Sequence, residues 1–229
     1  MRSALHPLSI AVLLLFAIGA QAGSINIPGV DSGSVNVGVK SLKERQFSSI
    51  VRQKLDFSCG SAALSTLLTH HYGDPINEET IFKSMWDEGD EAKIRSQGFS
   101  LLDIKSFLEK RGYSADGYTT TLDKLAHVGI PAIVLIKDGL YNHFVVIKGV
   151  KDGNVAFGDP SLGARVMRQN EFEKMLINRI VFVINGRNNQ AVFNNPRDWR
   201  VREKAPTHLA NGANDLANTM LLRRPVGDY

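Results

Sequence analysis

The 229-residue sequence contains one cysteine, two tryptophans and no apolar run longer than nine residues. One cysteine excludes an intramolecular disulfide and a zinc site built from several thiolates. The longest apolar run covers residues 10–18, whereas a helix that spans a membrane needs about 20 residues. Lysine and arginine outnumber aspartate and glutamate only by 27 to 23. The chain therefore lacks the strong positive charge that is typical of nucleic-acid binding. What remains is the composition of an ordinary soluble globular protein.

The first 22 residues have the pattern of a secretory signal. Arg2 precedes the apolar run, and Ala20 and Ala22 flank Gln21 in an A-x-A cleavage pattern. We therefore expect cleavage after Ala22 and, in a bacterium, a periplasmic mature chain. A membrane anchor is the alternative, but the apolar run is too short for one. Because the periplasm oxidises thiols, a single unpaired cysteine there suggests a thiol with a function.

The mature chain divides by composition into three parts. We expect residues 23–46 to be a flexible leader, residues 47–184 to be the folded domain, and residues 185–229 to be a separable tail rich in Asn and Arg. The tail has a net charge of +3, whereas the charges of residues 23–184 sum to zero. Two interpretations of the tail stay open: a docking arm for a partner, or a solvated extension. The neutral domain argues against nucleic-acid binding.

Helix signals dominate the first half of the domain. Ser58 as a cap, apolar residues at helical spacing and Gly73 as a stop together predict a helix over residues 59–72. Capping patterns predict further helices after Asn77, after Ser100 and after Thr120.

Strand signals dominate the second half. The sequence predicts strands from four β-branched runs, at residues 133–136, 143–150, 155–159 and 180–184. The pairs Asp138-Gly139 and Asp152-Gly153 between the first three runs are typical of antiparallel hairpins. Since helices precede strands, we expect an α+β fold with N-terminal helices packed on a C-terminal antiparallel sheet.

The one thiol, Cys59, lies at the predicted start of a helix. Unpaired backbone N–H groups and the helix dipole stabilise a thiolate there, so we expect a nucleophile with a pKa well below that of a free thiol. A small buried apolar residue is the alternative interpretation. Gln53, six residues upstream, carries an amide that can donate to an oxyanion beside the Cys59 N–H.

His143 and Asp159 are the candidate partners of this thiol. His143 opens one predicted strand and Asp159 closes the next, so a hairpin between them can bring the imidazole and the carboxylate together. His143 would then serve as the base and Asp159 would fix its tautomer. Alternatively, His143 is a surface residue of an edge strand and Asp159 is a turn residue before Pro160.

Three segments of the sequence resemble a known family. QKLDFSCGSAALSTLL, NHFVVIKGV and FGDPSLG are similar to the motifs of papain-like double-glycine cysteine peptidases, best known as bacteriocin-processing domains fused to ABC exporters. The resemblance covers about residues 47–184 and implies a papain-like fold with no metal or organic cofactor. It implies Cys59 as nucleophile, His143 as base, Asp159 as orienting carboxylate and Gln53 as oxyanion donor. Ser58 departs from the Asp that many members carry at this position.

With its signal, the sequence resembles the stand-alone, exported members that serve functional-amyloid secretion systems, and we expect no fused exporter. The resemblance implies cleavage after a Gly-Gly-type site in a secreted polypeptide, in support of amyloid or biofilm assembly. An outer-membrane secretion pore and amyloid subunits are candidate partners. Two alternatives remain: a non-catalytic peptide clamp or chaperone that uses the same groove, and an acyltransferase with the same order of Cys, His and Asp.

Overall fold

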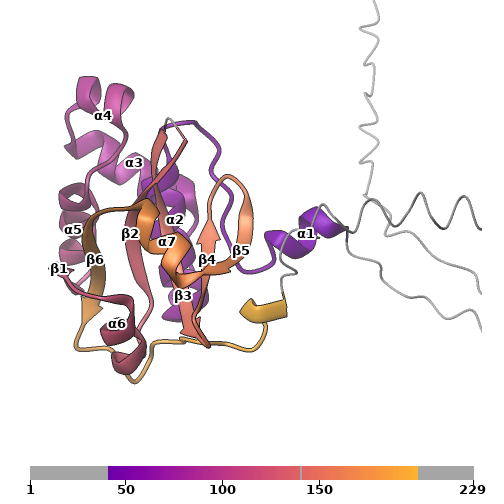
Figure 1. The fold of residues 1–229 in the computed structure, drawn as a ribbon. Helices are drawn as coiled ribbons and strands as arrows, with labels where there is room; N and C mark the ends of the chain where they lie inside the picture. The colour runs from indigo at the N-terminus through magenta and orange to yellow at the C-terminus, as the bar shows by residue number, and fades with distance from the viewer. Residues whose placement is uncertain (1–40, 140, 201–229) are drawn as a thin grey trace, which may run out of the picture. The chain divides into compact units, whose positions relative to one another are not determined.

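Helices α1 to α5 precede the first strand in the computed structural model, which describes residues 41–139 and 141–200, and two short helices interrupt the strands that follow (Figure 1). All labelled elements belong to one unit, Leu42–Tyr229. The helices are α1 (Leu42–Gln46), α2 (Cys59–His71), α3 (Glu78–Glu88), α4 (Glu91–Gln97), α5 (Leu101–Lys110), α6 (Leu122–Val128) and α7 (Gln169–Met175), with a 3-10 turn η1 (Asp198–Arg200). The strands are β1 (Ser114–Thr119), β2 (Ala132–Asp138), β3 (Tyr141–Lys151), β4 (Asn154–Asp159), β5 (Gly163–Arg168) and β6 (Leu176–Asn185).

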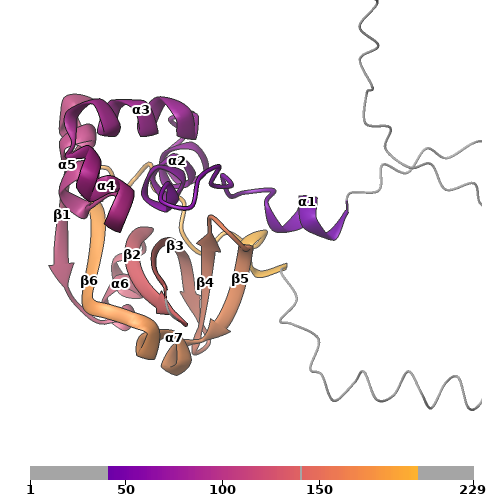
Figure 2. The same cartoon turned by 90° about the horizontal axis from the view of Figure 1, so that it is seen from above.

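The six strands form one sheet in the order β1-β6-β2-β3-β4-β5, and each neighbouring pair is antiparallel. Helices cover both faces of this sheet: α2 to α5 lie on one side, and α6 and α7 on the other (Figure 2). Neighbouring strand residues alternate between two cores, so that Ile133 packs with α2 while Val134 packs with α6. A strand buried on both faces has no polar side, which explains the continuous β-branched runs. The expected α+β, papain-like fold is confirmed.

Two of the expected caps form with their side chains, whereas Ser58 precedes α2 without a side-chain capping hydrogen bond. Asn77 accepts a hydrogen bond from the Thr80 N–H at the start of α3, and Ser100 forms a full capping box with Asp103 before α5. One prediction was off by a residue, because Thr121 and not Thr120 caps α6. Helix α4 was missed, although Asp90 caps it in the same way.

The sequence analysis did not predict β1 and β5, the two edge strands of the sheet. Strand β1 buries only Ala115 fully, and β5 buries only its first two residues, so neither carries an alternating apolar pattern. The hairpin turn before β4 formed as expected: Asp152 and Gly153 have φ values of 52° and 71°, which a type I′ turn requires.

Residues 186–200, called the C-terminal segment here, pack against the domain instead of extending from it. The N–H of Val192 donates to the carbonyl of His71, and that of Asn194 donates to the carbonyl of Lys148. A register shift between Ile147 and Gly149 accompanies the second contact. The expectation of a separable tail from residue 185 is therefore wrong for residues 186–200, because their backbone groups complete the domain.

Two other expectations concern the termini. Residues 42–46 of the expected flexible leader form helix α1. Gln46 at its end packs against Gly163 on β5, where an added Cβ on the glycine would lie 2.8 Å from the Cβ of Gln46. The expected signal at residues 1–22, the leader before residue 41 and the tail beyond residue 200 lie outside the described residues. Within the described part of the chain, every helix is too short or too polar to cross a membrane.

Candidate active site

Cys59 is the first residue of α2 and is 8% exposed. Backbone N–H groups of Phe144, of Gly60 and of Cys59 itself face its sulfur and favour the thiolate. Phe144 follows His143 directly on β3, so the thiol lies against the backbone next to the candidate base. Gly60 permits this approach: a Cβ at that position would meet Phe99 at 3.2 Å and Phe144 at 3.4 Å.

His143 and Asp159 lie side by side on adjacent strands, as expected. Nε2 of His143 is 3.2 Å from Oδ2 of Asp159. In the neutral imidazole this contact assigns the proton to Nε2, which donates to the carboxylate, and leaves Nδ1 free as the base. Among the described residues, the structure records no hydrogen bond between the imidazole and the Cys59 sulfur. Such contacts in ligand-free enzymes are often long and tighten when substrate binds.

Asp159 is fully buried and uses both of its oxygens. Oδ1 accepts hydrogen bonds from the backbone N–H groups of Ser161, at 2.8 Å, and Leu162, at 3.1 Å. Burial alone would raise the pKa of Asp159, but the hydrogen bond and the charge of His143, together with the two N–H groups, hold it below its ordinary value. The carboxylate therefore stays ionised and can orient the imidazole.

The expected low pKa of Cys59 is not what the site produces. Burial disfavours the thiolate and raises the pKa of Cys59 above its ordinary value, and the charge of Asp159 acts in the same direction. The three backbone N–H groups oppose this shift but do not reverse it. The start of the helix lowers the pKa of the Cys59 thiol, but the desolvation of the buried sulfur raises it by more.

Gln53 lies beside the turn that carries Asp159. Its backbone N–H donates to the carbonyl of Pro160, at 3.1 Å, and its Oε1 accepts from the hydroxyl of Ser161, at 3.3 Å. Nε2 donates to the carbonyl of Leu55, which leaves its second hydrogen for an oxyanion. The structure thus connects Gln53 to the Asp159 turn, but it records no contact of Gln53 with Cys59.

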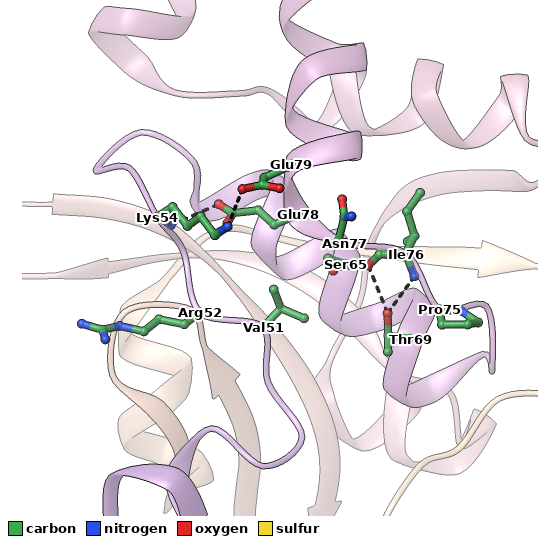
Figure 3. Close-up of a pocket in the computed structure, with 10 residues that line it drawn as sticks. All are labelled: Val51, Arg52, Lys54, Ser65, Thr69, Pro75, Ile76, Asn77, Glu78 and Glu79. Carbon is green, nitrogen blue, oxygen red and sulfur yellow. Dashed lines mark hydrogen bonds and ion pairs between the residues drawn. The ribbon is translucent and has the colours of Figure 1, made fainter. Parts of the chain in front are cut away.

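The sequence analysis did not single out Glu78, a buried carboxylate close to the start of α2. Oε1 of Glu78, a residue that is 4% exposed, accepts from the Ser58 hydroxyl at 2.5 Å and from the Lys54 N–H at 3.2 Å. The Ser58 hydroxyl, just before α2, therefore contacts Glu78 on α3 and does not cap its own helix. Glu78 and Lys54 line a cavity of about 400 Å³ that Val51, Pro75 and Ile76 also border (Figure 3). Cys59 and His143 do not line it.

A second residue missed from the sequence is Arg165 on β5, whose Nη1 lies 3.4 Å from Oδ2 of Asp159. No motif indicates it, because β5 itself carries no strand pattern. Its contact appears only when the sheet brings β4 and β5 together.

A thiol at the start of a buried helix, beside a strand histidine held by a buried carboxylate, is the arrangement of papain-like cysteine peptidases. The chain belongs to the peptidase C39 family, which it matches over residues 48–188.

Named relatives agree with this family. The chain is 39% identical to the probable functional amyloid protease FapD of Pseudomonas aeruginosa over 183 residues, which cover 80% of each chain. It is 40% identical to the protein of the same name from Pseudomonas fluorescens over 179 residues, which cover 78% of this chain and 79% of the other. Among solved structures, the peptidase domain of Streptococcus ComA, a bifunctional ABC transporter of a quorum-sensing pathway, superposes with a TM-score of 0.51. It is 19% identical, and the match covers 59% of this chain and 96% of that domain, a likeness of fold.

Proposed function

We propose that this chain is a periplasmic cysteine endopeptidase that cleaves an exported polypeptide after a Gly-Gly-type site and supports the assembly of extracellular amyloid. The observation that carries the proposal is the hydrogen bond between His143 and the buried Asp159, set beside the Cys59 thiol. The names of the two Pseudomonas relatives support an amyloid-related substrate. Candidate partners are amyloid subunits and an outer-membrane secretion pore.

The chemistry follows from the roles of the thiol, the imidazole and the carboxylate. Nδ1 of His143 takes the thiol proton as the Cys59 sulfur attacks the scissile carbonyl, and an S–C bond forms. The tetrahedral oxyanion is stabilised by the Cys59 N–H and the free hydrogen of Gln53 Nε2. The C–N bond then breaks, and the imidazolium gives its proton to the leaving amine. Water, activated by His143, attacks the thioester, breaks the S–C bond and restores the thiol.

The test is a cleavage assay with the purified mature chain. Exported polypeptides that carry a Gly-Gly pair are incubated with the chain, and their products are identified by mass spectrometry. We expect Cys59→Ala and His143→Ala to abolish cleavage, whereas His127→Ala, at an exposed position of α6, leaves it unchanged. Cleavage by Cys59→Ala would refute the peptidase mechanism.

A second outcome separates the peptidase from a clamp. If the wild type binds such a polypeptide tightly and never cleaves it, the chain is a binding module with the same groove. Location is tested separately, by fractionating cells that express the full chain. Recovery of the chain in the cytoplasm, with residues 1–22 retained, would contradict periplasmic export.

A further inference from the structure

Glu78, the first residue of α3, joins the two ends of the loop that precedes α2. Its Oε1 accepts a hydrogen bond from the Ser58 hydroxyl, at 2.5 Å. The same oxygen accepts from the Lys54 N–H, at 3.2 Å (Figure 3). Ser58 directly precedes the candidate nucleophile Cys59, and Lys54 directly follows the candidate oxyanion donor Gln53. One carboxylate oxygen therefore contacts the chain neighbours of both residues.

The Glu78 carboxylate is held in place by burial. Ile81 and Met85, on the same helix, pack in the core that also contains Leu67 of α2. Both Glu78 and Ser58 are buried, and Oε2 of Glu78 has no hydrogen-bond partner among the described residues. The two hydrogen bonds that this carboxylate accepts therefore both serve the loop before α2.

The carbonyl of Leu55, inside this loop, faces three donors. The Ser58 N–H and the Nε2 of Gln53 each lie 3.1 Å from the carbonyl oxygen, and the Ser58 hydroxyl lies 3.0 Å from it. A carbonyl oxygen has two lone pairs, so the three donors compete for it. The hydroxyl has a single proton, and Oε1 of Glu78 is the nearer and stronger of its two acceptors. Glu78 thus takes one competitor away from Leu55.

We propose that Glu78 is a positioning residue: by accepting the Ser58 proton, it leaves the Leu55 carbonyl to the amide of the candidate oxyanion donor. The inference rests on the proposed function, which assigns that donor role to Gln53. With Nε2 of Gln53 on Leu55 and its Oε1 on Ser161, the second Nε2 hydrogen has a fixed direction. Without Glu78, the Ser58 hydroxyl would turn to Leu55 and displace the amide.

The neighbouring residue Glu79 provides a matched control. It is the same residue type on the same turn of α3, but its side chain is 68% exposed and pairs with the Lys54 ammonium (Figure 3). Its partner is thus a surface side chain and not the Ser58 hydroxyl. Substitution of Glu79 removes a carboxylate from the start of α3 and leaves the donors around Leu55 as they are.

The kinetic experiment compares the variants on one cleaved peptide. We expect Glu78→Ala to lower kcat about tenfold with little change in KM, a smaller loss than removal of the oxyanion donor itself. Adding Ser58→Ala removes the competing hydroxyl, so the double variant should recover most of the lost kcat. Glu79→Ala should match the wild type. A purely structural role of Glu78 predicts instead that the double variant is worse than the single one.

A second measurement needs no turnover. The side-chain amide protons of Gln53 are followed by NMR in a Cys59→Ala background, and their loss in Gln53→Ala assigns them. Because a hydrogen-bonded amide exchanges slowly with water, we expect Glu78→Ala to speed this exchange about tenfold and the added Ser58→Ala to slow it again. Glu78→Gln, which keeps an acceptor oxygen in the same place, should lie near the wild type.

Faster exchange in Glu78→Ala that Ser58→Ala reverses supports the inference. Unchanged exchange in Glu78→Ala, or a double variant that is worse than the single one, overturns it. If circular dichroism shows that Glu78→Ala is unfolded, Glu78→Met, which fills the same space without an acceptor, takes its place. Failure of the wild type to cleave any polypeptide would contradict the proposed function but would not alter the exchange rates, so the two failures are distinguishable.

Discussion

At the scale of single residues, the candidate site combines a thiol whose pKa is raised with a carboxylate whose pKa is lowered. Burial acts on both groups in the same direction, but only Asp159 has enough hydrogen bonds and opposite charge to overcome it. Burial therefore disfavours the thiolate of Cys59, whereas Asp159 is held in its charged form.

The first prediction concerns the reactivity of Cys59. Because burial raises the pKa of its thiol, we expect the rate of alkylation by iodoacetamide to rise with a midpoint above that of a free thiol. The rate is measured from pH 5 to 11, with the urea-unfolded chain as the reference. A midpoint below neutrality would show that the thiol is ionised by an imidazolium in the resting state, contrary to the burial argument.

The second prediction concerns the oxyanion. If the free Nε2 hydrogen of Gln53 donates in the transition state, Gln53→Ala lowers kcat by about 10²-fold with little change in KM. Ser161→Ala is the matched control, because it removes the hydrogen bond to Gln53 but leaves the amide donor in place. Steady-state kinetics on a cleaved peptide measure both. Equal losses in the two variants would assign Gln53 to support of the Asp159 turn instead.

The sequence was sufficient to nominate Cys59, His143 and Asp159, because each sits at a boundary that local signals mark: a helix cap, a hairpin and a turn. It could not indicate Arg165 or Glu78. Their partners are six and twenty residues away, and the contacts exist only because strands pair and helices pack.

At the scale of elements, long helices and buried strands followed from periodicity and caps, whereas the edges of the sheet and the C-terminal segment did not. The segment is polar on average, and composition therefore suggested a solvated tail. Its attachment depends on a few residues, chiefly Asp198, whose carboxylate pairs with Lys148 on β3 and accepts from Ser49 at 3.2 Å. Lys148 is 1% exposed, so this ion pair is buried.

The third prediction tests that pair. Asp198→Ala leaves a buried ammonium without its counter-ion, and we expect it to reduce the free energy of unfolding by about 3–5 kcal/mol. Glu91→Ala, which breaks the exposed pair with Arg95, should cost under about 1 kcal/mol. Urea unfolding measures both variants.

Truncation tests the C-terminal segment as a whole. A chain that ends at residue 200 should fold, whereas one that ends at residue 189 should not. A stable fold for the shorter chain would contradict the role of the segment.

At the scale of the whole molecule, we expect a buried histidine outside the candidate site to reduce stability in acid. His71 ends α2; its Nδ1 is 2.6 Å from the carbonyl of Val192, and its Nε2 is buried without a hydrogen-bond partner. Burial lowers the pKa of His71 to about 4, although the hydrogen bond to Val192 opposes the shift. The folded chain therefore keeps this imidazole neutral, while the unfolded chain protonates it near its ordinary value of 6.5.

The fourth prediction follows from that difference. As the pH falls from about 6.5 to 4, His71 binds a proton in the unfolded state but not in the folded state. This difference should reduce the free energy of unfolding by about 3 kcal/mol over the range. Urea unfolding at several pH values measures the slope. His71→Gln should flatten it, and His127→Gln, at an exposed position, should not. An unchanged slope in His71→Gln would assign the acid sensitivity to other groups.

The hydrogen bond between Ser49 and Asp198 joins residues 149 positions apart and so ties the beginning of the described fold to its end. A contact of this span forms late, since most of the domain must be ordered before its two ends can meet. During synthesis, the ammonium of Lys148 stays without its carboxylate until residue 198 has left the ribosome. Completion of the fold, and with it a stable environment for the thiol, is thereby coupled to the synthesis of the chain as far as Asp198.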